Sequence, residues 1–235
     1  MVKAPIVLAV DTSDLGTAIE WVKATQDSIS VYKLGLEFFL TFGSDGVNAI
    51  KDVTDSDIFL DLKLHDIPHT VNGASKAIAH LKPKYLTVHA SGGAAMIKAA
   101  AEAVPNTLIT GVTILTSLGD PDLKSIGYRQ PALESAVELA KLAIHSGARA
   151  IVCSPLEISA IRKEIGIDPV IITPGVRPKG SENKDDQVRV MTPADAISAG
   201  ASLVVIGRPI TQSWTEGSSA MKEKAAQIAA QVLIN

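Results

Sequence analysis

The chain has 235 residues, of which 46% are hydrophobic, and its formal net charge is −3 at pH 7. This length suits one α/β barrel or two small domains, and the weak negative charge gives no general attraction to nucleic acid or acidic membrane. The chain has one cysteine, Cys153, so an internal disulfide is excluded. No apolar run approaches the roughly 20 residues of a membrane span, and the amino terminus runs into a strand without a signal peptide. We therefore expect a soluble cytoplasmic protein.

Eight strand-like runs are spread along the chain, with amphipathic, alanine-rich stretches at helical spacing between them. The predicted strands are Ile6–Val10, Val31–Leu34, Ile58–Lys63, Tyr85–His89, Leu108–Leu115, Ala150–Ser154, Val170–Thr173 and Leu203–Ile206. The predicted helices include Thr17–Thr25, Val71–Ala79, Ala94–Ala103, Ala132–His145 and Pro155–Ile165. Because strand alternates with helix and no linker or charge block divides the chain, we predict one domain over residues 1–235, a closed (β/α)8 TIM barrel of parallel strands.

Charged residues lie on the inward face of the first two predicted strands. Asp11 shares that face with Val7, and an acid at the mouth of a barrel suits ribose hydroxyls. Lys33 shares it with Val31, and a lysine that points into a barrel is costly to bury unless it is paired. The natural partner of Lys33 is Asp61 on the third strand, and a lysine that reaches the surface is the alternative.

The stretch from Ile58 to Thr70 carries the densest pattern of charge. Its first half alternates with period two, which predicts a strand with Asp61 and Lys63 on one face, and Asp66 follows just past the strand end. One interpretation is a surface strand with a salt-bridged polar face. The other is a charged cluster at the mouth of a barrel, in which the carboxylates raise the pKa of Lys63 and make it a proton donor rather than a nucleophile.

The middle of the chain offers fewer candidates. His89 ends the fourth predicted strand, where a structural hydrogen bond is a commoner role than catalysis. The stretch from Leu118 to Gln130 has no helical pattern, and long loops in compact domains are often lids or packing segments. Cys153 has no cysteine partner and no convincing base beside it, so we expect it to pack in the core.

The last two predicted strands are followed by a pattern typical of phosphate sites. The seventh runs into Pro174-Gly175-Val176-Arg177, and the eighth ends in Gly207-Arg208. Barrels often bind phosphate with the loops after strands seven and eight, where a glycine lets the backbone approach the anion and an arginine offers a bidentate contact. A charged surface loop is the alternative for most of the polar tract at 179–190.

Other kinds of site find no support in the sequence. There is no Gly-x-Gly-x-x-Gly or Walker loop, and no basic stripe with interleaved aromatic residues for nucleic acid. His65 and His69 have the spacing of metal ligands, but Pro68 lies between them at a predicted helix start, which argues against a zinc site.

The residues Asp61-x-Lys63-x-x-Asp66-Ile67, followed by Pro68-x-Thr70, resemble the signature of the orotidine 5′-phosphate decarboxylase family and its superfamily. The resemblance covers the chain from Asp11 to Arg208. Related keto-gulonate-phosphate decarboxylases and hexulose-phosphate synthases share the signature, but they typically carry glutamate at the position of Lys33 and use magnesium. Lys33 therefore favours the orotidylate branch, which implies no metal and no cofactor.

This resemblance implies decarboxylation of orotidine 5′-phosphate to uridine 5′-phosphate and carbon dioxide, the last step of de novo UMP synthesis. Lys63 is implied to protonate C6, with Asp61 beside the scissile carboxylate and Lys33 and Asp66 completing the charged set. The implied substrate contacts are Asp11 and Lys33 for the ribose, Thr116 for the base, and Arg177, Gln187, Gly207 and Arg208 for the phosphate. A homodimer is also implied, in which Asp66 and Thr70 reach the active site of the partner.

Two alternatives stay open from the sequence. One is a magnesium-dependent sugar-phosphate decarboxylase or aldolase of the same fold, and the other is a catalytically silent phosphate-binding barrel. Chelation separates the first from a metal-free enzyme, and an assay with orotidylate separates the second from any enzyme of this family.

Overall fold

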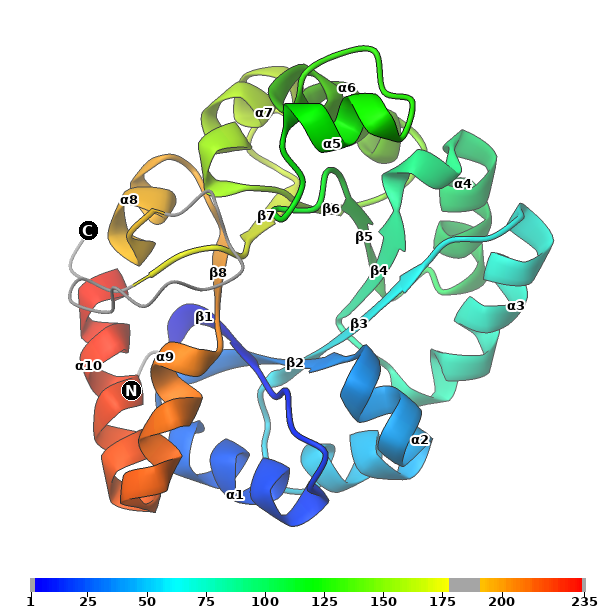
Figure 1. Ribbon diagram of the computed structural model, residues 1–235. Coiled ribbons are helices and arrows are strands. Elements are labelled where there is room, and N and C mark those ends of the chain that lie inside the picture. Colours follow the sequence, from blue (N-terminus) through cyan, green and yellow to red (C-terminus); the bar gives the residue numbers. More distant parts are fainter. Residues whose placement is uncertain (1–2, 178–190, 234–235) are drawn as a thin grey trace.

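A computed structural model describes residues 3–177 and 191–233 of the chain, and its parallel strands close into a barrel in sequence order from β1 to β8. Figure 1 looks along the barrel, with the strands inside and the helices around them. The strands are β1 (Ala4–Ala9), β2 (Ile29–Gly35), β3 (Asp57–Leu64), β4 (Tyr85–His89), β5 (Leu108–Val112), β6 (Ala150–Val152), β7 (Val170–Thr173) and β8 (Leu203–Ile206). The predicted fold class is confirmed, although β5 and β6 end at Val112 and Val152, before the predicted Leu115 and Ser154.

The helices cover the outside of the barrel (Figure 1). They are α1 (Leu15–Thr25), α2 (Leu36–Lys51), α3 (Pro68–Ile78), α4 (Ala94–Ala103), α5 (Asp120–Ser125), α6 (Ala132–His145), α7 (Ile158–Ile165), α8 (Pro193–Ser198), α9 (Arg208–Thr211) and α10 (Ser218–Leu233). Residues at the helix starts explain where α1 and α3 begin. The Asp14 side chain accepts a hydrogen bond from the Thr17 backbone at 2.6 Å and caps α1, and Pro68 occupies the first turn of α3. Among the described residues, no helix is both long and apolar enough to span a bilayer.

One stretch differs from the sequence prediction. The segment from Leu118 to Gln130, predicted to have no helix, contains the short helix α5. Asp122 accepts a hydrogen bond from the Gly119 backbone at 2.9 Å, and Pro121 lies in the first turn, so the helix start is well capped. Asp120 also accepts a hydrogen bond from the Ala132 backbone at 2.8 Å, which ties the segment to the start of α6.

Hydrophobic side chains fill both sides of the barrel wall. The inner group consists of Val7, Val31, Phe59, Tyr85, Ala150, Ile172 and Leu203. The rings of Phe59 and Tyr85 meet edge to face with centroids 5.6 Å apart. Alternate residues such as Ile6 and Leu8 point outward and pack beneath the helices, and Cys153 is fully buried in that layer, as predicted. The inner group forms an apolar floor on which the charged residues of the strand ends rest.

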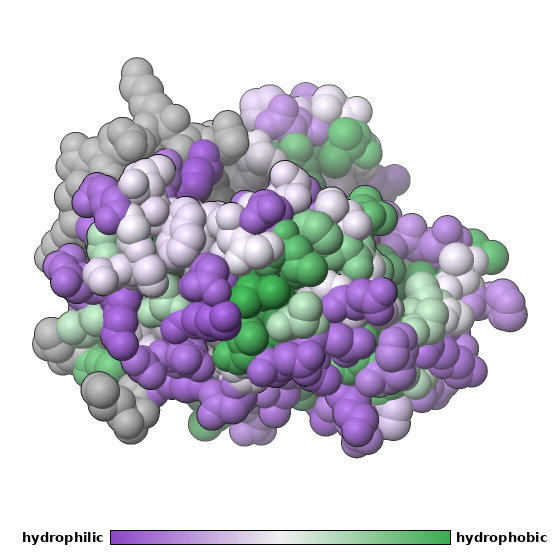
Figure 2. Space-filling view, turned by 90° about the horizontal axis from the view of Figure 1, so that it is seen from below, coloured by the Kyte–Doolittle hydropathy of each residue, from purple (hydrophilic) through white to green (hydrophobic). Residues whose placement is uncertain are grey.

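The outer surface carries an apolar band on one side. Figure 2 shows hydrophobic residues gathered between hydrophilic ones over the α1 and α2 side of the barrel. The exposed large hydrophobic residues include Leu36 and Leu40 of α2, and Ile67 at the carboxyl end of β3 is 65% exposed. These three residues follow the carboxyl ends of neighbouring strands, which is the end that carries the chemistry in barrels of this kind.

Candidate active site

A cavity of about 200 Å³ lies at the carboxyl ends of the strands. The residues that line it come from β2, β3 and the ends of β5 to β8, and they are Lys33, Phe59, Asp61, Lys63, Val112, Ile114, Leu115, Thr116, Val152, Pro174 and Val205. Most of these are apolar, with three charged residues gathered on one wall. An apolar cavity with a few convergent polar groups is the usual form of a small-molecule site.

Asp61 is the centre of the charged wall. Its two carboxylate oxygens each accept a hydrogen bond from the Lys63 ammonium at 2.8 Å. The Lys33 ammonium lies 3.5 Å from Asp61 Oδ2 and 3.4 Å from Asp11 Oδ1. The four side chains therefore form a row of alternating charge, and the interpretation of the Asp61-x-Lys63 pair as a plain surface salt bridge is wrong, because the Asp61 side chain is only 12% exposed.

The charges of this row support one another electrostatically. Burial raises the pKa of Asp61, but the attraction of Lys33 and Lys63 outweighs it, so the pKa of Asp61 lies below its usual value. Burial lowers the pKa of Lys33, and the nearby Asp61 and Asp11 carboxylates more than compensate, so the pKa of Lys33 lies above its usual value. Asp61 and Lys33 thus stay charged at neutral pH despite their burial.

Two features of the local backbone accompany this row of charged side chains: a glycine at the end of β2 and an unusual backbone conformation at Lys63. Gly35 ends β2 beside it, and a Cβ there would lie 3.1 Å from Lys33 Nζ and 3.3 Å from Asp11 Oδ1. Any side chain at this position would press on the Lys33–Asp11 pair. On β3, Lys63 has a φ of +47°, in the left-handed region that costs a non-glycine residue about 1–3 kcal/mol.

The conformation of Lys63 belongs to an irregularity between β3 and β4. Leu60 pairs with Leu86, but the next pair is Leu64 with Val88, so β3 carries extra residues that bulge. The Lys63 backbone N–H in this bulge donates to Thr87 Oγ1 at 2.8 Å, and the Thr87 hydroxyl donates to Asp61 Oδ1 at 3.0 Å. The sequence reasoning missed Thr87; the signal that could have found it is a hydroxyl on the inward face of the strand next to Asp61 and Lys63.

Two histidines flank the cluster. The rings of His65 and His89 have centroids 5.3 Å apart and are tilted by 43°. Burial lowers the pKa of His89, His65 and Lys63 lower it further, and Asp61 opposes them. The His89 ring makes no hydrogen bond within residues 3–177 and 191–233. The structural hydrogen bond that we expected for His89 is therefore not formed among these residues.

Asp66 and Thr70 lie apart from the cluster. Both are exposed, as is the whole segment from His65 to Thr70. The carboxylate of Asp66 accepts a hydrogen bond from the Ile67 backbone at 2.7 Å, so it turns toward its own chain at the start of α3. Within one chain, the structure brings together Asp11, Lys33, Asp61 and Lys63 of the predicted charged residues and leaves Asp66 on the surface.

The predicted phosphate residues lie at the ends of β7 and β8. Gly207 caps α9, and a Cβ there would lie 3.3 Å from the Ala9 side chain, so only glycine fits without a shift. Arg208 follows at the exposed start of α9. The Arg177 backbone donates to Met191 O at 2.9 Å, which joins the two ends of the intervening segment. Gln187 and the polar tract at 179–190 lie outside the described residues.

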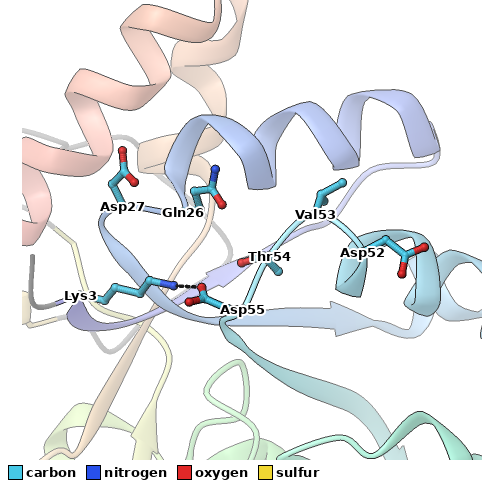
Figure 3. Close-up of a pocket in the computed structure, with 7 residues that line it drawn as sticks. All are labelled: Lys3, Gln26, Asp27, Asp52, Val53, Thr54 and Asp55. Carbon is cyan, nitrogen blue, oxygen red and sulfur yellow. Dashed lines mark hydrogen bonds and ion pairs between the residues drawn. The ribbon is translucent and has the colours of Figure 1, made fainter.

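A larger cavity of about 660 Å³ lies at the opposite end of the barrel. Figure 3 shows Lys3 paired with Asp55 there, while the carboxylates of Asp27 and Asp52 lie on opposite sides and do not converge on that pair. The Asp55 side chain is 87% exposed, so this is a solvated surface pair. Within residues 3–177 and 191–233, no group of three or more His, Cys, Asp or Glu side chains is placed to hold a metal ion.

Comparison with known proteins connects this geometry to a family. The model described as "Orotidine 5'-phosphate decarboxylase / HUMPS family" matches residues 4–223. A relative named orotidine 5′-phosphate decarboxylase from Thermobifida fusca (strain YX) is 50% identical over 217 residues, which cover 92% of this chain and 93% of the relative. One of the same name from Wolbachia pipientis subsp. Culex pipiens (strain wPip) is 46% identical over 218 residues, 92% of this chain and 95% of the relative.

A solved structure agrees with these sequence relatives. The crystal structure of orotidine 5′-phosphate decarboxylase from Lactobacillus acidophilus matches with a TM-score of 0.80 and 34% identity, covering 97% of this chain and 99% of that one. The family resemblance inferred from the signature around Asp61 and Lys63 is thereby confirmed.

Proposed function

The chain belongs to the orotidine 5′-phosphate decarboxylase / HUMPS family, and we propose that it converts orotidine 5′-phosphate to uridine 5′-phosphate and carbon dioxide without a metal or organic cofactor. In de novo UMP synthesis this is the last step. The observation that carries the proposal is the row Asp11–Lys33–Asp61–Lys63 at the mouth of an apolar cavity. Lys33 is central to it, because a cation at this position fills the place where the magnesium-dependent relatives have a carboxylate ligand. With one cysteine, Cys153, the chain also suits the reducing cytoplasm.

The chemical need explains the cluster. Loss of carbon dioxide leaves an electron pair in an sp² orbital at C6, with no conjugated group to take it up. The protein therefore has to stabilise that charge electrostatically, and an ammonium fixed near C6 does so before giving up a proton. Lys63, which lines the cavity and is held by both oxygens of Asp61, is the group that takes this role. Asp61 then lies beside the departing carboxylate.

The remaining residues hold the nonreacting parts of the substrate. We assign Asp11 and Lys33 to the ribose hydroxyls, which suits their position at the rim of the cavity, and Thr116, which lines it, to the pyrimidine. The phosphate is assigned to the ends of β7 and β8, through Arg177, Gln187, Gly207 and Arg208. Support for this end comes from the pair Gly207-Arg208 at the start of α9, where a glycine lets the backbone approach an anion and an arginine can offer a bidentate contact.

A homodimer completes the proposed site. Asp66 and Thr70 are exposed beside the mouth of the barrel, and within their own chain they do not join the charged row. The exposed Ile67 and the exposed Leu36 and Leu40 of α2 lie on the same end of the barrel and offer apolar surface for a partner. In this arrangement Asp66 and Thr70 of one subunit reach the active site of the other, and each site draws on two chains.

An absorbance assay tests the function directly. Orotidine 5′-phosphate mixed with the protein should lose its characteristic pyrimidine absorbance and give uridine 5′-phosphate, and turnover should survive exhaustive chelation. Activity that disappears on chelation and returns with magnesium would favour a sugar-phosphate decarboxylase or aldolase instead. Binding of the nucleotide without any turnover would leave a catalytically silent barrel.

A further inference from the structure

Thr87 is a fully buried residue of β4 that contacts the charged row from behind. Its hydroxyl accepts a hydrogen bond from the Lys63 backbone N–H at 2.8 Å and donates its proton to Asp61 Oδ1 at 3.0 Å. One oxygen atom thus links the backbone of one charged residue to the side chain of the other. Because a hydroxyl has a single proton, donating to Asp61 leaves its lone pairs for the Lys63 N–H.

These two hydrogen bonds act at the point where the backbone is strained. Lys63 adopts a φ of +47° in the bulge between β3 and β4, a conformation that persists only where the surroundings hold it. In this bulge the Lys63 N–H donates to a side-chain hydroxyl, that of Thr87, where a regular strand would use a backbone carbonyl as acceptor. Without it, the N–H of Lys63 loses its acceptor and Asp61 loses one of its donors, leaving the lysines as the ion-pair partners of Asp61.

We propose that Thr87 is a positioning residue that sets the geometry of Lys63 relative to Asp61, and this inference rests on the role of Lys63 given above. Thr87 does not line the cavity, so it acts through the two residues it contacts. A linked N–H to hydroxyl to carboxylate chain polarises along its length, which strengthens each bond in it. As a consequence, the Lys63 side chain is held in its reactive orientation before the chemical step, and it has to move little to reach the transition state.

The test replaces the hydroxyl while keeping the shape. Thr87→Val is isosteric and removes both hydrogen bonds, and Thr87→Ser restores the hydroxyl. Thr110→Val is the matched control, because Thr110 is the fully buried neighbour of Thr87 in β5 and its hydroxyl bonds only to Leu108 O, at 3.0 Å, among the described contacts. Should Thr87→Val fold poorly, Thr87→Ala removes the same hydroxyl with less steric conflict.

We expect Thr87→Val to lower kcat about ten- to a hundredfold, the usual effect of losing a hydrogen bond to a charged group, with a smaller change in KM. The acidic limb of the kcat profile should move to higher pH, because Asp61 loses a donor that favours its ionised form. Thr87→Ser and Thr110→Val should stay near the wild type in both respects. Equal kcat and equal pH profiles for Thr87→Val and Thr110→Val would overturn the inference.

A second measurement is independent of turnover. The carbon-13 signal of the Asp61 carboxyl should titrate at higher pH in Thr87→Val than in the wild type, and at the wild-type value in Thr87→Ser and Thr110→Val. An unchanged titration in Thr87→Val would contradict the role of Thr87 whatever the enzyme acts on. If instead the wild type fails to convert orotidylate while the titration moves as expected, the proposed function is wrong and the contact between Thr87 and Asp61 still stands.

Discussion

Asp61 Oδ1 and Oδ2 both lie 2.8 Å from Lys63 Nζ, although the two residues are next-but-one neighbours on a single strand. Side chains at such positions on a regular strand run parallel to one another. Here the bulge at Lys63 turns its side chain back over Asp61, so one carboxylate holds the lysine with two hydrogen bonds. A lysine held in this way presents its ammonium at a fixed place in the cavity.

The first prediction concerns stability. Asp61→Asn should lower the free energy of unfolding by about 3–5 kcal/mol, because it leaves the ammonium groups of Lys33 and Lys63 without their shared carboxylate in a largely buried site. Glu20→Gln is the matched control, since it also removes the acid of an ion pair, at 2.9 Å from Lys23, but on the surface. Urea unfolding at neutral pH measures both. Equal losses for the two variants would mean that burial adds nothing to the Asp61 pairs.

The second prediction concerns pH. Because burial, His65 and Lys63 lower the pKa of His89, the folded protein binds a proton there less readily than the unfolded chain, whose value is near 6.5. The contribution of neutral His89 is therefore complete above pH 6.5 and is lost as the pH falls below it. Relative to His89→Gln, the wild type should lose stability as the pH is lowered from about 7 through 6.5 and below. If the stabilities of the two proteins change in parallel across this range, the lowered pKa of His89 in the folded protein is contradicted.

Much of the fold and part of the site could be predicted from the sequence for physical reasons. Period-two alternation placed Asp61 and Lys63 on one face, and the cost of burying Lys33 alone pointed to Asp61 as its partner, which is confirmed. The conformation of Lys63 could not be predicted, because its bulge depends on how β3 pairs with β4. Thr87 was missed for the same reason: its role appears only when that neighbouring strand is in place.

The helix α5 was missed for a different reason. Its sequence has too little apolar periodicity to predict a helix, and its stability comes from capping by Asp122 and from the contact of Asp120 with the start of α6. The proposed role of Asp66 depends on a second chain, because within one chain its carboxylate contacts only the neighbouring Ile67 backbone among the described hydrogen bonds.

The third prediction tests the shared site. Lys63→Ala and Asp66→Ala homodimers should both be nearly inactive, because every site lacks one essential residue. After mixing and re-association, half of the dimers are mixed and one of their two sites is intact, so about a quarter of the wild-type specific activity should return. A mixture of Lys63→Ala with Asp61→Asn is the control and should stay inactive, since both residues belong to the same chain's site. Absence of recovery in confirmed Lys63→Ala/Asp66→Ala heterodimers would place Asp66 in the site of its own chain.

The fourth prediction concerns the phosphate end. We expect the bound phosphate to bury its contact with Arg208. Losing one partner of such a buried charged contact costs about 2–5 kcal/mol, so Arg208→Ala should lower kcat/KM for orotidine 5′-phosphate by roughly one and a half to four powers of ten. Orotidine, which lacks the phosphate, should be turned over slowly by the wild type, and Arg208→Ala should barely change that slow rate. A similar loss for both substrates would mean that Arg208 supports the barrel rather than binding the phosphate.

The phosphate contact should also act on the chemical step. Binding energy from a nonreacting group lowers the barrier when it helps to exclude water and strengthen the field around Lys63. Orotidine should therefore show a lower kcat at saturation, or a lower single-turnover rate where saturation is out of reach. An unchanged rate for orotidine would restrict the phosphate site to capture of the substrate.

The central claim is that Lys63 stabilises the charge at C6 and then protonates it, and the rate of decarboxylation of enzyme-bound orotidylate tests it most directly. Single-turnover experiments with enzyme in excess separate this rate from binding and product release. Lys63→Ala should lower it by at least about ten-thousandfold, because it removes both a charge aimed at the reacting carbon and the proton donor. A single-turnover rate for Lys63→Ala within about tenfold of the wild type would contradict the account.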